Sequence, residues 1–171
     1  LTGEAEILVE DRLFATLDPL TREAEVAEGA PLLVTDTVGF VRKLPHQLVA
    51  SFRATLEETR EADLLVHVVD ASHPQWEEQR AVVEEVLAEI GVGETPALLA
   101  FNKVDRMQPD EVAALRERAA NDGVEAVFVS ALADGGLEPL RAALAAHARR
   151  ARQVVELAIP VGDGKAIAAL H

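Results

Sequence analysis

The sequence contains no cysteine, which excludes a disulfide framework, a cysteine-ligated zinc site and thiol catalysis. It also contains no apolar run near the roughly 20 residues that a membrane-spanning helix needs. The first residues lack a basic stretch followed by an apolar one, so they do not read as a secretory signal peptide. We therefore expect a soluble cytoplasmic protein. The chain starts at Leu1 rather than at Met, which suggests a fragment.

Basic residues are scarce beside acidic ones. The chain has 16 Lys and Arg against 30 Asp and Glu, for a formal net charge of −14. Such a chain repels nucleic acid on average, so no DNA partner is expected. Contact with RNA or a ribosome would need a local basic patch, of which Arg42 and Lys43 are the candidates, or another domain. A length of 171 residues with 49% hydrophobic residues predicts one domain with a true core.

Short apolar runs alternate with amphipathic segments. The pattern predicts strands at 32–35, 64–69, 97–101 and 124–129 and helices at 45–61, 75–90, 109–121 and 136–150. Strands separated by helices indicate an α/β fold with a mostly parallel sheet. Residues 21–27 are expected to pair with 31–35 as an antiparallel hairpin at the sheet edge. Residues 151–171 differ in pattern and predict the start of a second, truncated segment.

The strand at 97–101 is followed by Asn102-Lys103-Val104-Asp105, an N-K-x-D sequence. A carboxylate at Asp105 can accept hydrogen bonds from the ring N1–H and the exocyclic amine of guanine, a donor pair that adenine lacks. The Asn102 amide can reach the outer edge of the base, and the stem of Lys103 can lie along the ring face. Four residues alone are weak support, because a capping loop explains them nearly as well.

Other polar sequences follow the remaining strands in an order that fits a nucleotide site. Asp36-Thr37-Val38-Gly39 is a D-x-x-G, in which Asp can hold Mg²⁺ through water and Gly lets a backbone N–H approach a phosphate. Ser130-Ala131-Leu132 follows the fifth strand and is placed to brace the base. Upstream, Thr16 within Phe14-Ala15-Thr16-Leu17-Asp18 offers a hydroxyl to Mg²⁺. Ligands of open α/β sheets bind at the carboxyl ends of strands, where most of these sequences fall.

Longer strings resemble a known family. The run from Val9 to Pro19 resembles switch I of the HflX family of translational GTPases, and the run from Asp36 to His46 resembles its switch II. Residues 52–59 continue in the manner of that family. The resemblance implies a P-loop GTPase-like three-layer sandwich over residues 1–150.

That resemblance also implies roles for individual residues. Thr16 and Asp36 become Mg²⁺ ligands, and Gly39 becomes the γ-phosphate contact. Guanine recognition falls to Asn102, Lys103 and Asp105, supported by Ser130 and Ala131. The implied ligands are GTP or GDP with Mg²⁺, the implied activity is GTP hydrolysis, and the implied partner is the large ribosomal subunit, in splitting or rescuing ribosomes.

Two departures from the family stand out. No G-x-x-x-x-G-K-[ST] phosphate-binding loop is present, so residues 1–150 predict a GTPase domain lacking that loop, and this piece alone is expected to bind nucleotide weakly and to be inactive. Phe40 occupies the place where many GTPases have the Gln that orients the attacking water. Slow intrinsic hydrolysis, accelerated by a partner, is therefore expected.

Three alternatives stay open. The first is a non-hydrolysing pseudo-GTPase that binds partners, and the second is a switch GTPase of the Obg or Era kind. The third is an adenine-nucleotide role, which these residues do not support directly. Asp70-Ala71-Ser72, at the end of the strand at 64–69, resembles the end of a strand in a GTPase sheet, and a helix-cap role is favoured over catalysis.

Overall fold

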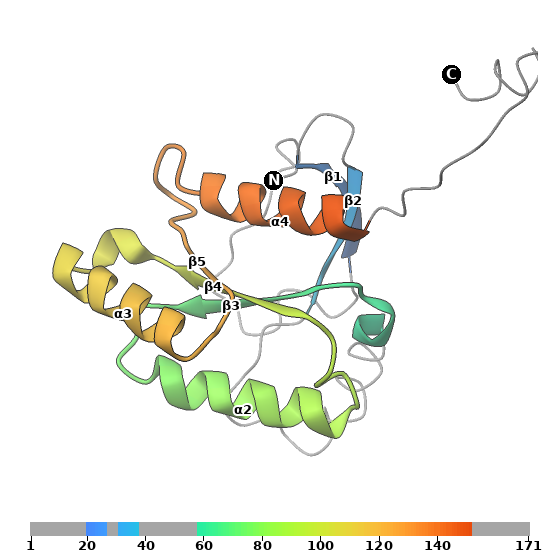
Figure 1. Cartoon of the computed structure of the whole chain (residues 1–171), viewed down its shortest axis with the longest axis horizontal. Helices are drawn as coiled ribbons and strands as arrows, with labels where there is room; N and C mark the ends of the chain where they lie inside the picture. The colour runs from blue at the N-terminus through green and yellow to red at the C-terminus, as the bar shows by residue number, and fades with distance from the viewer. Residues whose placement is uncertain (1–19, 27–30, 38–57, 152–171) are drawn as a thin grey trace, which may run out of the picture.

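The structure, a computed structural model, describes residues 20–26, 31–37 and 58–151 (Figure 1). Its first sheet is an antiparallel pair formed by β1 (Leu20–Glu25) and β2 (Pro31–Asp36). The second is a parallel sheet in the order β3-β4-β5, made of β3 (Leu65–Asp70), β4 (Ala97–Asn102) and β5 (Ala126–Phe128). Crossover helices connect these strands, as parallel pairing requires.

Three α-helices and two short 3₁₀ helices complete the described part. They are η1 (Glu58–Glu61), α2 (Trp76–Glu89), η2 (Val104–Arg106), α3 (Pro109–Asn121) and α4 (Glu138–Ala151). Pro109 opens α3, where its missing N–H costs nothing. The Glu111 carboxylate accepts a hydrogen bond from the Gln108 backbone N–H at 2.8 Å and secures that start. No described helix has the length and apolar character needed to cross a membrane.

Helices lie on both faces of the parallel sheet, with α4 on one side and α2 and α3 on the other (Figure 1). Alternate residues of β4 supply the two cores, because successive side chains of a strand point to opposite faces. Leu99 and Phe101 pack in the cluster that includes Leu115 of α3. Leu98, fully buried, packs with Leu144 of α4. Burial on both faces explains why residues 97–101 of β4 are all apolar.

Apart from residues 58–61, the predicted element types agree with the described structure. The hairpin pairing is confirmed, with Thr21 opposite Thr35. The described residues show it as a separate two-stranded sheet rather than as the edge of the parallel sheet. Val26, just after β1, nevertheless packs into the core beneath α4.

Boundaries differ by a few residues at several elements. β5 is shorter than the predicted strand at 124–129, although hydrogen bonds to β4 continue beyond it, from Val129 N–H to Phe101 O at 2.9 Å. The predicted helix at 45–61 lies mainly outside the described residues, and its last four residues form η1 rather than an α-helical turn. Of the predicted segment at 151–171, Ala151 is the last residue of α4, and residues 152–171 lie outside the described residues.

Candidate guanine-recognition site

The end of β4 is held firmly by aromatic packing. Phe101 is almost completely buried at 1% exposure. Its ring stacks on Phe128 of β5 at 5.2 Å and meets the Trp76 ring edge-on at 5.1 Å. Both arrangements are favourable geometries for aromatic pairs. The residue that follows, Asn102, is therefore presented from a rigid strand end.

The side chain of Asn102 joins two loops at this rim. Its Oδ1 atom accepts hydrogen bonds from the backbone N–H of Lys103 at 2.8 Å and of Ala131 at 3.1 Å. Two N–H donors fix which amide atom faces them, because only the oxygen can accept. The amide NH₂ group is left with no partner in the described part of the chain, so it is available as a donor.

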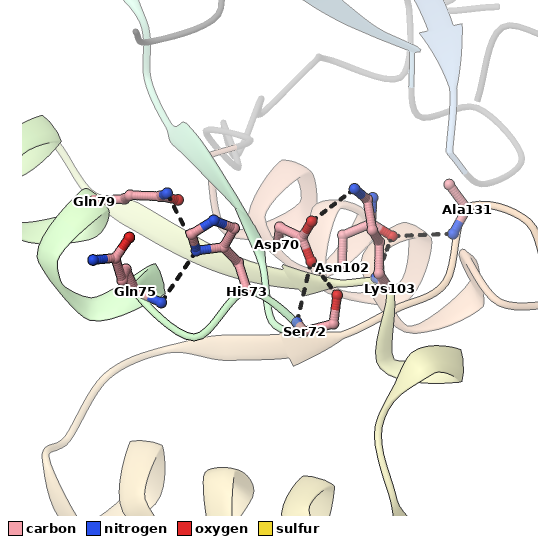
Figure 2. A network of polar contacts seen from close by, with 8 residues as sticks. All are labelled: Asp70, Ser72, His73, Gln75, Gln79, Asn102, Lys103 and Ala131. Carbon is pink, nitrogen blue, oxygen red and sulfur yellow. Dashed lines mark hydrogen bonds and ion pairs between the residues drawn. The ribbon is translucent and has the colours of Figure 1, made fainter. Parts of the chain in front are cut away.

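Lys103 is tied down at both ends. Its backbone has φ of +64°, the left-handed region that a non-glycine residue seldom adopts. Its Nζ atom lies 2.7 Å from Oδ2 of Asp70, at the end of the neighbouring strand β3 (Figure 2). The long side chain is therefore held at both ends, by its own backbone after β4 and by the Asp70 carboxylate at the end of β3.

Asp70 is itself oriented by the turn that follows β3. Its Oδ1 atom accepts hydrogen bonds from Ser72, from the backbone N–H at 3.1 Å and from Oγ at 2.6 Å (Figure 2). Partial burial acts to raise the pKa of Asp70, but the hydrogen bonds from Lys103 and Ser72 and the Lys103 charge outweigh it and lower that pKa. Asp70 is thus ionised at neutral pH.

The Asp105 carboxylate, unlike that of Asp70, is not held by other side chains in the described part of the chain. Asp105 lies in η2, which is closed by a hydrogen bond from the Arg106 N–H to the Lys103 carbonyl at 3.0 Å. Its side chain is exposed, and among the described residues it has no ion-pair or hydrogen-bond partner. Both carboxylate oxygens are therefore free to accept hydrogen bonds from a ligand.

The loop after β5 closes on itself beside Asn102. Ser130 is 4% exposed, and its Oγ atom accepts a hydrogen bond from the Ala133 N–H at 3.2 Å. The Ser130 N–H donates to the Gly136 carbonyl at 3.1 Å. A Cβ atom on Gly136 would lie 2.1 Å from the Ser130 carbonyl oxygen, so the turn requires glycine there. Leu132 projects from this loop at 84% exposure.

Comparison with known proteins identifies the family of the chain. Residues 1–103 match the profile of a family described as "50S ribosome-binding GTPase". The chain belongs to that family. This GTPase-family chain is 45% identical over all of its 171 residues to a GTPase HflX of Magnetococcus marinus. It is 43% identical over 141 residues, 82% of the chain, to a GTPase HflX of Escherichia coli. The resemblance to HflX proteins is confirmed.

The chain spans 39% of the length of the Magnetococcus protein and 33% of that of the Escherichia coli protein. Among solved structures, it is similar to a GTP-binding protein of Sulfolobus solfataricus in complex with GDP. That match has a TM-score of 0.66 at 28% identity, over 77% of this chain and 45% of the other. Era of Aquifex aeolicus bound to GDP·AlF₄⁻ matches with a TM-score of 0.54 at 21% identity, over 85% of this chain and 48% of the other. This likeness shows a shared fold, and the α/β GTPase fold is confirmed.

The structure brings part of the predicted site together. Asn102, Lys103 and Ala131 form one hydrogen-bonded group, with Val104, Asp105, Ser130 and Leu132 in the adjoining loops. The Ala131 N–H, expected to brace the base, here bonds Asn102, and the Ser130 hydroxyl serves the loop's own turn.

The remaining predicted residues are not joined to this group. Asp36 ends β2 and Thr37 follows it, and in the described part no hydrogen bond or ion pair connects either residue to the rim around Asn102. The other members of the prediction lie outside the described residues; they are Phe14, Ala15, Thr16, Leu17, Asp18, Val38, Gly39 and Phe40.

The interpretation of Asp70 as a helix cap is wrong. α2 begins at Trp76, its N-cap residue is Gln75, and the Asp70 carboxylate bonds Lys103 instead. The sequence held one usable signal, because Asp70 and Asn102 both end apolar strands and parallel strands end at the same edge. Their register pairing, Asp70 opposite Asn102, brings the two side chains to one place.

Proposed function

We propose that the protein is a GTP-binding and GTP-hydrolysing switch, and that the described rim around Asn102 and Asp105 recognises the guanine base. The observation that carries this proposal is the hydrogen-bonding capacity left free there. Asp105 offers two acceptor oxygens, and Asn102 offers an NH₂ donor whose position is fixed by the bonds to its oxygen.

Guanine matches this free capacity. Its N1–H and exocyclic amine donate side by side to one carboxylate, and its ring N7 accepts from an amide. Adenine has no hydrogen on N1 and has an amine where guanine has a carbonyl, so it would leave the Asp105 carboxylate without its paired donors. Leaving a charged group unpaired in a ligand site is costly, which favours guanine over adenine.

The phosphate and magnesium contacts are assigned to Thr16, Val38 and Gly39, which lie outside the described residues, and to Asp36, which lies within them. Asp36 is described, exposed and without a partner there, and a carboxylate oxygen is the kind of ligand Mg²⁺ prefers. The described residues hold no group of three His, Cys, Asp or Glu side chains that could bind a metal ion. Thr16 and the phosphates are the proposed co-ligands of Asp36. When bound, Mg²⁺ would offset the phosphate charge.

The nucleotide site also requires a phosphate-binding loop, which these 171 residues do not contain. We assign residues 1–150 to a GTPase domain completed by such a loop elsewhere in the full-length protein. The apolar side chains of β3 that face away from α2 support this assignment, because Val66 and Val68 are 37% and 59% exposed. Valines of a parallel strand are ordinarily covered, and a further strand and helix would cover them.

Switching would follow from the segments at 9–19 and 36–46, which would be held by γ-phosphate and Mg²⁺ and released on hydrolysis. Phe40 has no group that hydrogen-bonds water strongly, which supports slow intrinsic hydrolysis and an activating partner. The family description, which names 50S ribosome binding, supports the large ribosomal subunit as that partner. The cytoplasm, where ribosomes lie, is the corresponding location.

Replacing Asp105 by Asn tests guanine recognition in the full-length protein. The variant loses charge-assisted bonds worth about 1.5–3 kcal/mol, so the Kd for GDP should rise about ten- to a hundredfold. Xanthine has a carbonyl where guanine has its exocyclic amine, so the new amide should bind xanthosine diphosphate more tightly than the wild type does. Asp110→Asn removes the same charge from the exposed start of α3 and should leave both affinities unchanged. Unaltered GDP binding by Asp105→Asn, measured by calorimetry, would refute the assignment.

Hydrolysis is tested separately, by measuring phosphate release from GTP by the full-length protein with and without large ribosomal subunits. Acceleration by the subunits supports an activated switch. Equal rates would contradict the activating role, and tight binding without any turnover would identify a non-hydrolysing binding module instead.

A further inference from the structure

The ion pair between Lys103 and Asp70 links the two strand ends that frame the recognition rim. The residues are 33 positions apart, and their charged atoms lie 2.7 Å from each other. Both side chains remain partly open to solvent, at 41% for Lys103 and 30% for Asp70. Pairs this exposed contribute little to folding stability, because solvent screens them and two side chains must be ordered. Stability alone is therefore a weak reason for this contact.

The contact is nevertheless more rigidly built than an ordinary surface pair. Ser72 holds one Asp70 oxygen through two hydrogen bonds, so the other oxygen points at Lys103 (Figure 2). The Ala71 N–H donates to the Asn102 carbonyl at 2.9 Å, so the two strand ends cannot separate. The carboxylate thus occupies a fixed position relative to the backbone of Lys103.

The backbone of Lys103 is fixed in turn by Asn102. Its left-handed conformation carries strain that the hydrogen bond from its N–H to Asn102 Oδ1 helps to offset. With the backbone held by Asn102 and the ammonium held by Asp70, the four methylene groups between them are restrained at both ends. A restrained apolar stem offers a surface on which the face of a purine ring can lie.

We propose that Asp70 is a positioning residue for nucleotide binding: it restrains the Lys103 side chain, so that the stem is already in place for the face of the base. This inference rests on the proposed guanine site. The advantage is entropic, since an unrestrained lysine would lose its rotamer freedom only when the nucleotide bound. Asp70 itself need not touch the ligand.

A double-mutant cycle in the full-length protein tests this role, with GDP as the probe. Asp70→Asn should raise the Kd for GDP about three- to tenfold. Lys103→Met keeps an apolar stem but removes the ammonium, and it should weaken binding by a similar factor. The double variant should bind as the Lys103→Met variant does, because Asp70 acts through the ammonium. Effects that multiply instead would overturn the proposal.

Further variants separate positioning from a general effect on folding. Glu77→Gln breaks another exposed ion pair, to Arg118, and should change neither GDP affinity nor the melting temperature appreciably. Ser72→Ala loosens the Asp70 carboxylate without removing it, and should weaken GDP binding less than Asp70→Asn does. If Asp70→Asn fails to fold, Ser72→Ala tests the proposal in its place. Unchanged GDP affinity in Ser72→Ala would then count against the proposal.

The outcome for Asp105→Asn distinguishes failure of the positioning role from failure of the guanine site. If Asp105→Asn weakens GDP binding and Asp70→Asn does not, the positioning role is refuted and the guanine site stands. If neither substitution changes GDP binding, the guanine site itself is refuted.

Discussion

Asn102 reaches from the end of β4 to Ala131 in the loop after β5, where its side-chain oxygen accepts the Ala131 backbone N–H at 3.1 Å. The same oxygen accepts the Lys103 N–H. One short side chain therefore sets the relative position of the two loops proposed to hold guanine. The recognition rim depends on this contact before any ligand binds.

Removing that contact should damage both the fold and the site. Asn102→Ala leaves two backbone N–H groups without their acceptor, which should lower the free energy of unfolding by about 1–3 kcal/mol. It also removes the amide donor proposed for the base, so GDP affinity should fall. Denaturant unfolding and calorimetry on the full-length protein measure the two effects.

Asn102→Asp is the matched control for that experiment. The carboxylate keeps an acceptor for both N–H groups, so most of the stability should return, while the lost NH₂ donor and the added charge still weaken GDP binding. Stability equal to that of Asn102→Ala would show that the hydrogen bonds to Lys103 and Ala131 do not support the rim.

Gly136 and Gly135 offer a test of the loop after β5. Alanine at Gly136 places a Cβ atom against the Ser130 carbonyl, so the loop backbone must move. We expect a stability loss of about 1–3 kcal/mol together with weaker GDP binding, because the displaced Ser130 lies next to Ala131.

Gly135→Ala provides the comparison. Gly135 has φ of +67° and nothing within 4 Å of an added Cβ. Its replacement should cost about 1–2 kcal/mol through backbone conformation alone and leave GDP affinity near the wild-type value. Equal losses of GDP affinity in both variants, in a calorimetric titration, would argue against a specific role for the Ser130 turn.

We expect the free energy of unfolding to depend on pH through His67, which lies in β3. Burial lowers the pKa of His67 below 6.5; the charge of Glu84 opposes this shift and that of Arg80 adds to it. The unfolded chain therefore takes up a proton at a higher pH than the folded one does. Stability is full above the ordinary histidine pKa and decreases as the pH falls through 6.5 and then through the folded value.

The variant His67→Gln should remove that part of the pH dependence. The free energies of unfolding at pH 7.5 and pH 5.5 should lie closer together in the variant than in the wild type. Denaturant titrations at the two pH values give this difference directly. Equal pH dependence in the two proteins would exclude His67 as its source.

The fold was largely predictable because β4 and α3 have strong local signals. Residues 97–101 of β4 are an uninterrupted apolar run. α3 has Pro109 at its first turn and Asn121 at its end, the bounds that the structure shows. β5 was harder to delimit. Its predicted strand at 124–129 includes end residues that hydrogen-bond to β4 without belonging to the regular strand.

The sequence by itself determined the alternation of strands and helices and the chemistry available after each strand, because apolar periodicity and side-chain type are local properties. It placed Asn102, Lys103 and Asp105 at one strand end and indicated guanine. Only the tertiary structure decided that Lys103 is held by Asp70 and that the Ala131 N–H is bound by Asn102. Those contacts join residues about 30 positions apart, and they depend on strand register and loop closure, which no local pattern encodes.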